Sequence, residues 1–326
     1  MDYGLAETTR CRSKRAQPRL YLAAPHPAWV ALVQGALRRN VRCSWIDVGV
    51  RARRDLNVTI REKEEQMTKS RVLQKLRSGD FVRVASIGRV ADPWLTEVIG
   101  RLGFDVLWLD MEHRAFGYEV IDPLSLACRA TGMDLMVRLL KTGYSSPMRC
   151  LEFGANGLMI PHVRSVEEAR QWVEWTRFPP LGRRGFDGAG VDADYMLADP
   201  LQHLEHGNRE VFLALQIEDR EAVDCVEGIA ATEGVDLLFV GPADLTISYG
   251  VPFDFNHSSV QRAIDRIAAA AAKAGKWWGT TSGTPESAQK ALDRGARMVT
   301  CGSDHVFLVK GFEKSIQDFG ELRVRS

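Results

Sequence analysis

Hydrophobic and polar positions alternate along most of the chain in two different rhythms. From Phe81 onward, short apolar or β-branched runs of strand length are separated by amphipathic stretches of about ten to fifteen residues. This alternation predicts a regular succession of strands and helices. The eight predicted strands are residues 81–88, 106–110, 134–140, 157–163, 212–218, 235–241, 276–281 and 298–303.

Three of the intervening helices have recognisable first turns. One begins with a capping box at 165–168, and another begins at Thr284 with Pro285 in its first turn. A third is expected to be capped by Ser258 or Ser259. The apolar faces of the first and third comprise Ala169, Trp172, Val173 and Thr176, and Val260, Ile264, Ile267 and Ala271.

Eight strands that alternate with helices over about 240 residues have the length and rhythm of an α/β fold of the (β/α)8 (TIM) barrel type. An open, doubly wound sheet is the alternative. It is disfavoured because no GxGxxG motif follows the first strand and no second domain remains after Met67. We therefore expect residues 67–326 to form one barrel domain.

Residues 1–66 differ from the rest of the chain in charge and pattern. They contain 13 Lys and Arg against 7 Asp and Glu, a net charge of +6, whereas the remainder carries −5. The interrupting acids fit a targeting peptide or a nucleic-acid-binding arm poorly. We interpret 1–66 as an N-terminal extension, poorly ordered or translated from too early a start, that the barrel does not need.

Composition excludes several classes of protein. The 326 residues are 45% hydrophobic and 26% charged, and the six cysteines form no CxxC pair, so a disulfide scaffold or a structural zinc site is not expected. No apolar run approaches the roughly 20 residues that span a bilayer. We expect a cytoplasmic, soluble protein with no membrane or nucleic-acid partner.

Polar side chains follow several predicted strands, at the ends where barrel enzymes place their chemistry. A run as apolar as 106–109 has no structural need to end in two carboxylates and an imidazole. Because side chains alternate along a strand, Gln216 and Glu218 should face the same side. The polar residues at four strand ends are Asp110, Glu112 and His113, Arg138, Gln216 and Glu218, and Asp244.

Glu218 and Asp244 are separated by one βα unit and should face each other. Two carboxylates with a nearby amide oxygen suit a hard divalent cation such as Mg²⁺ or Mn²⁺. The turn at 241–244 offers backbone N–H groups to a carboxylate, and Arg138 would lie across from it. Together they describe a site for a 2-oxo acid. The structural alternatives are a helix-capping Glu218, a turn-solvating Asp244, and a buried ion pair of Arg138.

Several collinear motifs give the chain a family resemblance. The motifs are "ADPWLTEVIGRLGFD", "WLDMEH", "MVR", "LEFGANGLMIPHVRSVEEAR", "RFPPLGRRG", "LQIED", "VGPADL" and "CGSD". From about Arg77 to Gly320 the chain resembles the HpcH/HpaI aldolase and citrate lyase family, in its metal-requiring, pyruvate-dependent aldolase branch. The resemblance implies a (β/α)8 barrel, reversible cleavage to pyruvate and an aldehyde, and a hexamer of dimers that exchange their last helix.

The resemblance also implies roles for individual residues. Glu218 and Asp244 correspond to metal ligands for Mg²⁺, Mn²⁺ or Co²⁺, His113 to the acid/base residue, and Arg138 to the residue that holds the keto or enolate oxygen. The residues implied to bind substrate are Gln216, Arg138, Gly241, Pro242 and Ala243, and those implied to support His113 or a metal-bound water are Asp110 and Glu112.

The chain departs from the family pattern at three places. Glu152 replaces an Asp that can pair with the catalytic His, so pairing with His113 is expected in altered geometry. The segments "RLLKTGYSSP" after Arg138 and "FDGAGVDADY" after "GRRG" are also unusual. We expect them to reshape the mouth around Tyr144. We further expect the long 177–195 connection, through Arg184 and Asp187, to reach a neighbouring subunit, the alternative being a solvated loop.

The predicted function is a divalent-metal-dependent aldolase that cleaves a 4-hydroxy-2-oxo acid to pyruvate, or a related 2-oxo acid, and an aldehyde. A lyase that acts on a CoA thioester is one alternative, although the sequence shows no clear basic rim for a nucleotide. A barrel that binds a 2-oxo acid without turning it over is the other.

Overall fold

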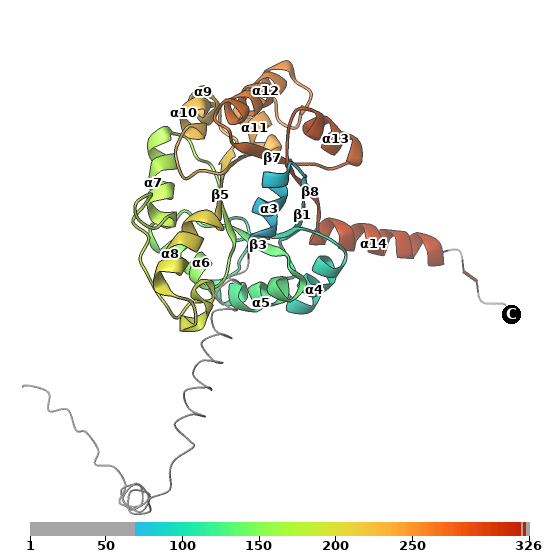
Figure 1. Ribbon diagram of the computed structural model, residues 1–326. Helices are drawn as coiled ribbons and strands as arrows, with labels where there is room; N and C mark the ends of the chain where they lie inside the picture. Colours follow the sequence, from blue (N-terminus) through green and yellow to red (C-terminus); the bar gives the residue numbers. More distant parts are fainter. Residues whose placement is uncertain (1–68, 321, 324–326) are drawn as a thin grey trace, which may run out of the picture. The chain divides into compact units, whose positions relative to one another are not determined.

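The computed structural model describes residues 69–320, 322 and 323, so the predicted extension at 1–66 lies outside the described residues. Eight parallel strands close into a single barrel in chain order (Figure 1), which confirms the predicted fold class. All eight predicted strands are present. They are β1 (Val82–Ile87), β2 (Val106–Asp110), β3 (Asp134–Arg138), β4 (Gly157–Ile160), β5 (Phe212–Ile217), β6 (Leu237–Val240), β7 (Trp277–Thr281) and β8 (Met298–Ser303).

Helices occupy the connections between the strands and surround the barrel (Figure 1). Two short 3₁₀ helices, η1 (Tyr118–Val120) and η2 (Val191–Met196), interrupt the connections after β2 and β4. The α-helices are α3 (Arg71–Ser78), α4 (Pro93–Arg101), α5 (Ile121–Thr131), α6 (Ser145–Glu152), α7 (Val166–Thr176), α8 (Pro200–Arg209), α9 (Arg220–Asp224), α10 (Val226–Ala230), α11 (Pro242–Ser248), α12 (Ser258–Lys273), α13 (Pro285–Asp293) and α14 (Asp304–Phe319).

Two helices begin as the sequence predicts. The Ser165 side chain caps α7 by accepting the N–H of Glu168, and Thr284 caps α13 in a reciprocal capping box with Ser287. In α7 the second half of the box differs, because the Glu168 carboxylate accepts the N–H of Arg164 instead of that of the cap.

The predicted start of α12 is wrong by one residue. His257, not Ser258 or Ser259, is the N-cap, and its ring nitrogen accepts the N–H of Ser259. Ser258 is already helical, so its hydroxyl is not in the extended position from which an N-cap side chain reaches back to the first turn.

Side chains alternate along each strand between the barrel interior and the layer between strands and helices, so the barrel has two apolar layers. On β2, Val106 and Trp108 belong to the cluster that fills the barrel, whereas Leu107 and Leu109 pack outward against the helices. The same alternation brings the next inward position on β2, Asp110, to the carboxyl end of the strand. Trp108 meets Phe239 of β6 edge to face across the interior, with centroids 5.5 Å apart, so the interior is packed and solid beneath the mouth.

Helix α3 closes the opposite end of the barrel, which we call the base. Its Val72, Leu73 and Leu76 join the interior cluster. Asp134, at the start of β3, accepts hydrogen bonds from the Ser70 hydroxyl at 2.6 Å and from the N–H of Val72 at 2.9 Å. The base is therefore sealed by apolar packing and by a saturated carboxylate.

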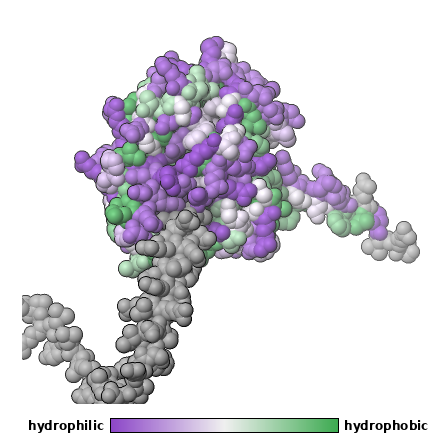
Figure 2. All heavy atoms as spheres, viewed as in Figure 1, coloured by the Kyte–Doolittle hydropathy of each residue, from purple (hydrophilic) through white to green (hydrophobic). Residues whose placement is uncertain are grey.

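The last helix, α14, extends away from the barrel after β8 (Figure 1) and exposes large apolar side chains, Phe312 and Ile316 among them. The side of the barrel that faces the viewer in Figure 2 carries mainly hydrophilic residues between smaller hydrophobic patches. Within residues 69–320, no helix is long and apolar enough to cross a membrane.

Candidate active site at the barrel mouth

Asp110 and Arg138 form the first part of the mouth, at the carboxyl ends of the paired strands β2 and β3. Arg138 is 8% exposed, and its Nε and Nη2 reach the two carboxylate oxygens of Asp110 at 3.0 and 2.9 Å. Burial raises the pKa of Asp110, but the bonds and charge of Arg138 outweigh it and hold that pKa below its ordinary value. The buried ion pair of Arg138, which the sequence left as a structural alternative to a functional role, is therefore present, within the site itself.

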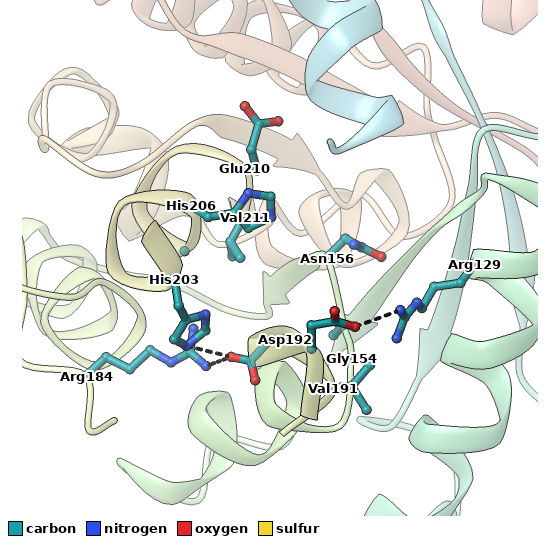
Figure 3. Close-up of a pocket in the computed structure, with 13 residues that line it drawn as sticks. Arg129, Gly154, Asn156, Arg184, Val191, Asp192, His203, His206, Glu210 and Val211 are labelled. Atoms are coloured by element: carbon teal, nitrogen blue, oxygen red, sulfur yellow. Dashed lines mark hydrogen bonds and ion pairs between the residues drawn. The ribbon is translucent and has the colours of Figure 1, made fainter. Parts of the chain in front are cut away.

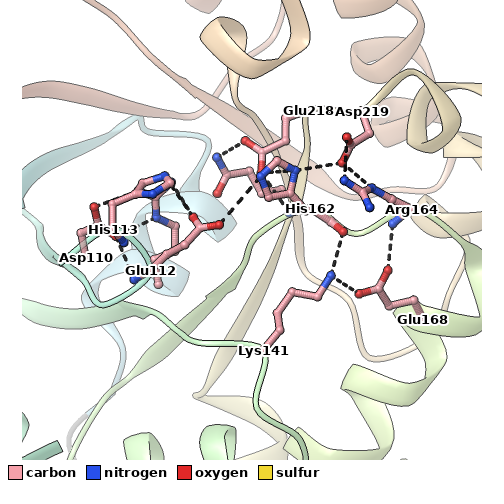
Figure 4. A network of polar contacts seen from close by, with 11 residues as sticks. Asp110, Glu112, His113, Lys141, His162, Arg164, Glu168, Glu218 and Asp219 are labelled. Carbon is pink, nitrogen blue, oxygen red and sulfur yellow. Dashed lines mark hydrogen bonds and ion pairs between the residues drawn. The ribbon is translucent and has the colours of Figure 1, made fainter. Parts of the chain in front are cut away.

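Glu112 and His113 follow in the loop after β2. The Asp110 carboxylate accepts both of their backbone N–H groups, at 3.1 and 3.3 Å, which fixes the loop. Glu112 Oε2 lies 3.2 Å from Nη1 of Arg138 and 3.5 Å from Nε2 of His113 (Figure 4). The His113 side chain is half exposed, so it can meet a molecule that enters from solvent.

Gln216 and Glu218 project into the mouth from the end of β5, on the same side as predicted. Glu218 is 1% exposed, and its Oε2 accepts a hydrogen bond from the Gln216 amide. Burial is the main reason that the pKa of Glu218 rises to about 7, and the negative charges of Asp244 and Glu112 add to it, against the opposing effect of His162. Glu218 is therefore a desolvated carboxylate that two neighbouring carboxylates repel.

The turn at the start of α11 packs directly against these groups. A Cβ on Gly241 would lie 2.1 Å from Oε2 of Glu218 and 2.8 Å from the amide nitrogen of Gln216, so any larger residue there would displace these two side chains. Pro242, Ala243 and Asp244 form the first turn of the helix, and all three are partly exposed. Sequence reasoning placed this turn beside Glu218, and the structure agrees.

The donor set fits a hard divalent cation. Gln216 Oε1 is a buried acceptor with no hydrogen-bond partner, on a side chain whose amide nitrogen binds Glu218, and the charge of Asp244 also acts on Glu218. A cation would use this oxygen and relieve the carboxylate repulsion. Among residues 69–320, 322 and 323, no three His, Cys, Asp or Glu side chains gather into a metal-binding group.

His162, directly after β4, is a site residue that sequence reasoning missed. Its backbone N–H donates to Glu218 Oε1 at 2.9 Å, and its ring Nδ1 lies 2.9 Å from Oδ2 of Asp219 (Figure 4). Burial alone would lower the pKa of His162, but the bond to Asp219 and the charges of Glu218 and Glu112 raise it above its ordinary value. The available signal was its place in "MIPHV", at a strand end like the residues that were noticed.

Glu152 does not join the site, and the expectation that it pairs with His113 is corrected. Helix α6 starts at the carboxyl end of β3 and returns to the start of β4, so Glu152, its last residue, lies at the other end of the barrel. The charged groups that influence it are Arg184, Asp192, Asp187 and Arg149, none of which belongs to the mouth.

Arg184 is likewise buried within its own chain, which contradicts its predicted role as a contact to a neighbouring subunit. It is 4% exposed and pairs with Asp192 beside a cavity of about 90 Å³ (Figure 3). His203 on α8 lines the same cavity, 3.6 Å from Asp192. This cavity lies among α5, η2, α8 and the segments that precede β4 and β5, away from the strand ends that carry the mouth residues.

Comparison with known proteins places this site in a family. The model of the HpcH/HpaI aldolase/citrate lyase family matches residues 89–310. The chain belongs to that family. A 5-keto-4-deoxy-D-glucarate aldolase from Klebsiella pneumoniae is 37% identical over 215 residues, which cover 66% of this chain and 83% of the relative.

Solved structures of family members agree with the fold. An HpcH/HpaI aldolase from Desulfitobacterium hafniense superposes with a TM-score of 0.73 at 29% identity, covering 77% of this chain and 96% of that one. An HpcH/HpaI aldolase/citrate lyase family protein from Burkholderia cenocepacia gives 0.71 at 30% identity, covering 77% and 100%. The predicted reaction class is confirmed: this family member is an aldolase, a carbon–carbon lyase.

Proposed function

We propose that the mouth is the active site of a class II aldolase that cleaves a 4-hydroxy-2-oxo acid related to 5-keto-4-deoxy-D-glucarate into pyruvate and an aldehyde. The observation that carries the proposal is the buried pair Gln216 and Glu218, with an unpartnered oxygen on Gln216, in the same mouth as the guanidinium of Arg138. A relative 37% identical carries the name of such an aldolase.

Glu218 and Asp244 would hold the divalent cation, Mg²⁺, Mn²⁺ or Co²⁺. When bound, it polarises the 2-oxo group and stabilises the negative charge that cleavage creates. Glu218 is almost completely buried, so in its ionised form it attracts a cation through little intervening water.

The protein's own groups supply the remaining chemistry. Arg138 has N–H groups left over after its bonds to Asp110, and these can donate to the oxygen of the 2-oxo group as charge develops there. The turn Gly241–Ala243 would hold the pyruvate carboxylate, and Gln216 would lie beside the bound acid. Burial of Arg138 excludes water, which strengthens its bond to the substrate oxygen.

Cleavage requires one proton to move at each side of the broken bond. The 4-hydroxyl loses its proton, the C3–C4 bond breaks, the aldehyde leaves, and C3 gains a proton to become the methyl group of pyruvate. His113 is the candidate carrier because its ring is half exposed at the mouth. Asp110 fixes the backbone of His113, and Glu112 contacts its ring.

We also infer that the protein assembles with copies of itself. The exposed Phe312 and Ile316 on α14 support exchange of this helix between subunits, because an isolated projecting helix gains little from apolar side chains in water. A hexamer and a cytoplasmic location stay predictions.

Proton exchange tests the proposal without knowledge of the aldehyde. Protein loaded with Mg²⁺, Mn²⁺ or Co²⁺ is incubated with pyruvate in D₂O, and the loss of the methyl proton signal is followed by NMR. We expect exchange that a chelator abolishes. Arg138→Lys keeps the charge but loses the planar fork, and should slow exchange markedly without loss of metal. Absence of exchange with all three metals would overturn the aldolase mechanism and favour a binding role.

A further inference from the structure

His162 links the ends of four neighbouring strands. It follows β4, its N–H binds Glu218 and its Nδ1 binds Asp219 beyond β5, and its carbonyl oxygen accepts Nζ of Lys141 beyond β3 at 2.9 Å. On the fourth side, its Nε2 faces Glu112 beyond β2, at 3.8 Å from Oε1. These contacts hold the backbone of His162 and one of its two ring nitrogens.

The backbone of His162 is in the left-handed region, with φ of +46°. A non-glycine residue pays a conformational cost there, although Asn, Asp and His tolerate it better than most. Such a conformation persists only when surrounding contacts fix it, and it is concentrated at functional sites. In His162 it turns the N–H to Glu218 and at the same time projects the imidazole over the mouth.

One ring nitrogen remains available to a ligand. Asp219 occupies Nδ1, whereas Nε2 is beyond hydrogen-bond distance of Glu112, and the side chain is 31% exposed. Nε of Arg164 lies 3.0 Å from Oδ2 of Asp219. Arg164 therefore fixes the carboxylate that in turn fixes the His162 ring at Nδ1. A ring fixed at one nitrogen and open at the other is suited to contact a bound molecule.

The shape of the barrel decides which part of the substrate reaches this nitrogen. In the proposed function the pyruvate half occupies Arg138 and the turn at Gly241. The interior below is filled by Trp108 and Phe239, so the aldehyde half must extend outward. His162 lies between Glu112 and Glu218 (Figure 4), so a substituent of the aldehyde half that extends outward on this side meets its ring.

We infer that His162 determines substrate specificity by hydrogen bonding, through Nε2, to an oxygen substituent on the aldehyde half. The inference rests on the proposed function and narrows the substrate class to 4-hydroxy-2-oxo acids whose aldehyde half carries a hydroxyl or carboxylate. An apolar aldehyde would leave Nε2 of His162 without a hydrogen-bond partner in a partly desolvated place, and is therefore disfavoured.

Aldol addition measures this preference directly. Pyruvate and Mn²⁺-loaded protein are combined with glycolaldehyde, glyoxylate or propanal, and kcat/KM is determined for each. His162→Asn retains tolerance of the left-handed backbone and can reach Asp219, but is too short to occupy the Nε2 position. We expect it to reduce the preference for the two oxygenated aldehydes over propanal by about 10- to 100-fold. The aldehyde that loses most identifies the group recognised, hydroxyl or carboxylate.

Two further variants distinguish loss of the His162 ring from a folding defect or a general change in the surrounding contacts. His162→Gly removes the ring without backbone strain and should show the same loss of preference if His162→Asn folds poorly. Arg164→Gln removes the other partner of Asp219 and should change the preference less than about threefold.

Exchange of pyruvate protons in D₂O is the internal reference. It should fall less in His162→Asn than addition of the two oxygenated aldehydes does, because the backbone N–H that binds Glu218 is retained while the ring that contacts the aldehyde half is lost. An unchanged aldehyde preference would overturn the inference. So would an equal loss of exchange and of all three additions, since His162 would then act only by positioning Glu218. Failure of the wild-type protein to exchange pyruvate would instead reject the proposed function.

Discussion

The two ends of the barrel carry buried carboxylates in very different environments. At the base, Asp134 accepts three hydrogen bonds, from the Ser70 hydroxyl and from the N–H groups of Arg71 and Val72. At the mouth, Gln216 Oε1 is buried without a hydrogen-bond partner, and Glu112 Oε2 has only its ion pair with Arg138 and its contact with His113. Buried polar groups are normally satisfied, so the contacts of Asp134 are explained by the fold, whereas the free oxygen of Gln216 is open to a ligand.

The comparison shows that residue type alone does not separate structure from function. Asp105 at the base is fully buried and is held by Arg71 and Lys75 at 2.9 and 2.7 Å, as closely as Asp110 is held by Arg138 at the mouth. What distinguishes the two ends is whether buried polar atoms still lack a hydrogen-bond partner in the folded protein. Four predictions test it, from the largest expected effect to the smallest.

The same substitution at each end should have opposite consequences. Glu218→Gln removes a charged ligand, and we expect pyruvate exchange to fall by more than about 10³-fold and Mn²⁺ affinity in calorimetry to be lost. Its metal-free stability should be unchanged or higher, because a desolvated carboxylate is removed. Glu210→Gln, at the base, is the matched control and should retain Mn²⁺ binding and exchange. Equal loss of metal in both variants would remove the distinction between the two ends.

His113→Ala separates proton transfer from metal binding within the mouth. We expect catalysis to fall by about 10²- to 10⁴-fold, the usual contribution of a positioned acid/base group, while Mn²⁺ and pyruvate still bind. Titration calorimetry together with steady-state kinetics provides the measurement. If this variant loses metal as severely as Glu218→Gln, His113 is a ligand and its role must be reassigned.

Asp134→Ala tests the base. It leaves three donors at the start of α3 unpaired, and at about 1 kcal/mol each we expect the free energy of unfolding to fall by about 3 kcal/mol. Denaturant titration measures the loss. Pyruvate exchange per folded molecule should be unchanged at low temperature. A selective loss of exchange in a fully folded variant would mean that the base influences the chemistry at the mouth.

The smallest effect concerns the cavity of Figure 3, which adjoins the base through Glu210. Burial lowers the pKa of His203, and the nearby charge of Arg184 adds to this against the opposing effect of Asp192. The folded protein therefore binds a proton at His203 less readily than the unfolded chain does. Stability from the neutral ring is present above the unfolded pKa of about 6.5 and is lost as pH falls below it.

Unfolding by denaturant at pH 7.5, 6.5 and 5.5 tests this expectation. Wild-type stability should decrease toward pH 5.5, and His203→Gln should show a weaker pH dependence whatever its absolute stability. An identical pH dependence in the two proteins would assign the loss to other groups.

Local pattern in the sequence determined the barrel and most of the mouth. Alternation on β2 and β5 fixes which side Asp110, Gln216 and Glu218 face, because the side-chain period of a strand is independent of its neighbours. The rhythm of strands and helices likewise fixed their order around the barrel. Arg138 was recognised as a costly inward charge, although its partners were not.

Only the tertiary structure decided which residues meet. Glu152 was assigned to the mouth, the wrong end of the barrel. Its motif does not show that α6 runs from the mouth back toward the start of β4 and ends at Glu152. His162 was missed because its importance lies in a left-handed backbone and in contacts to β2, β3 and β5, none of which leaves a local pattern. Contacts between residues far apart in sequence depend on strand closure, so the satisfied base and the unsatisfied mouth could be distinguished only once the barrel was formed.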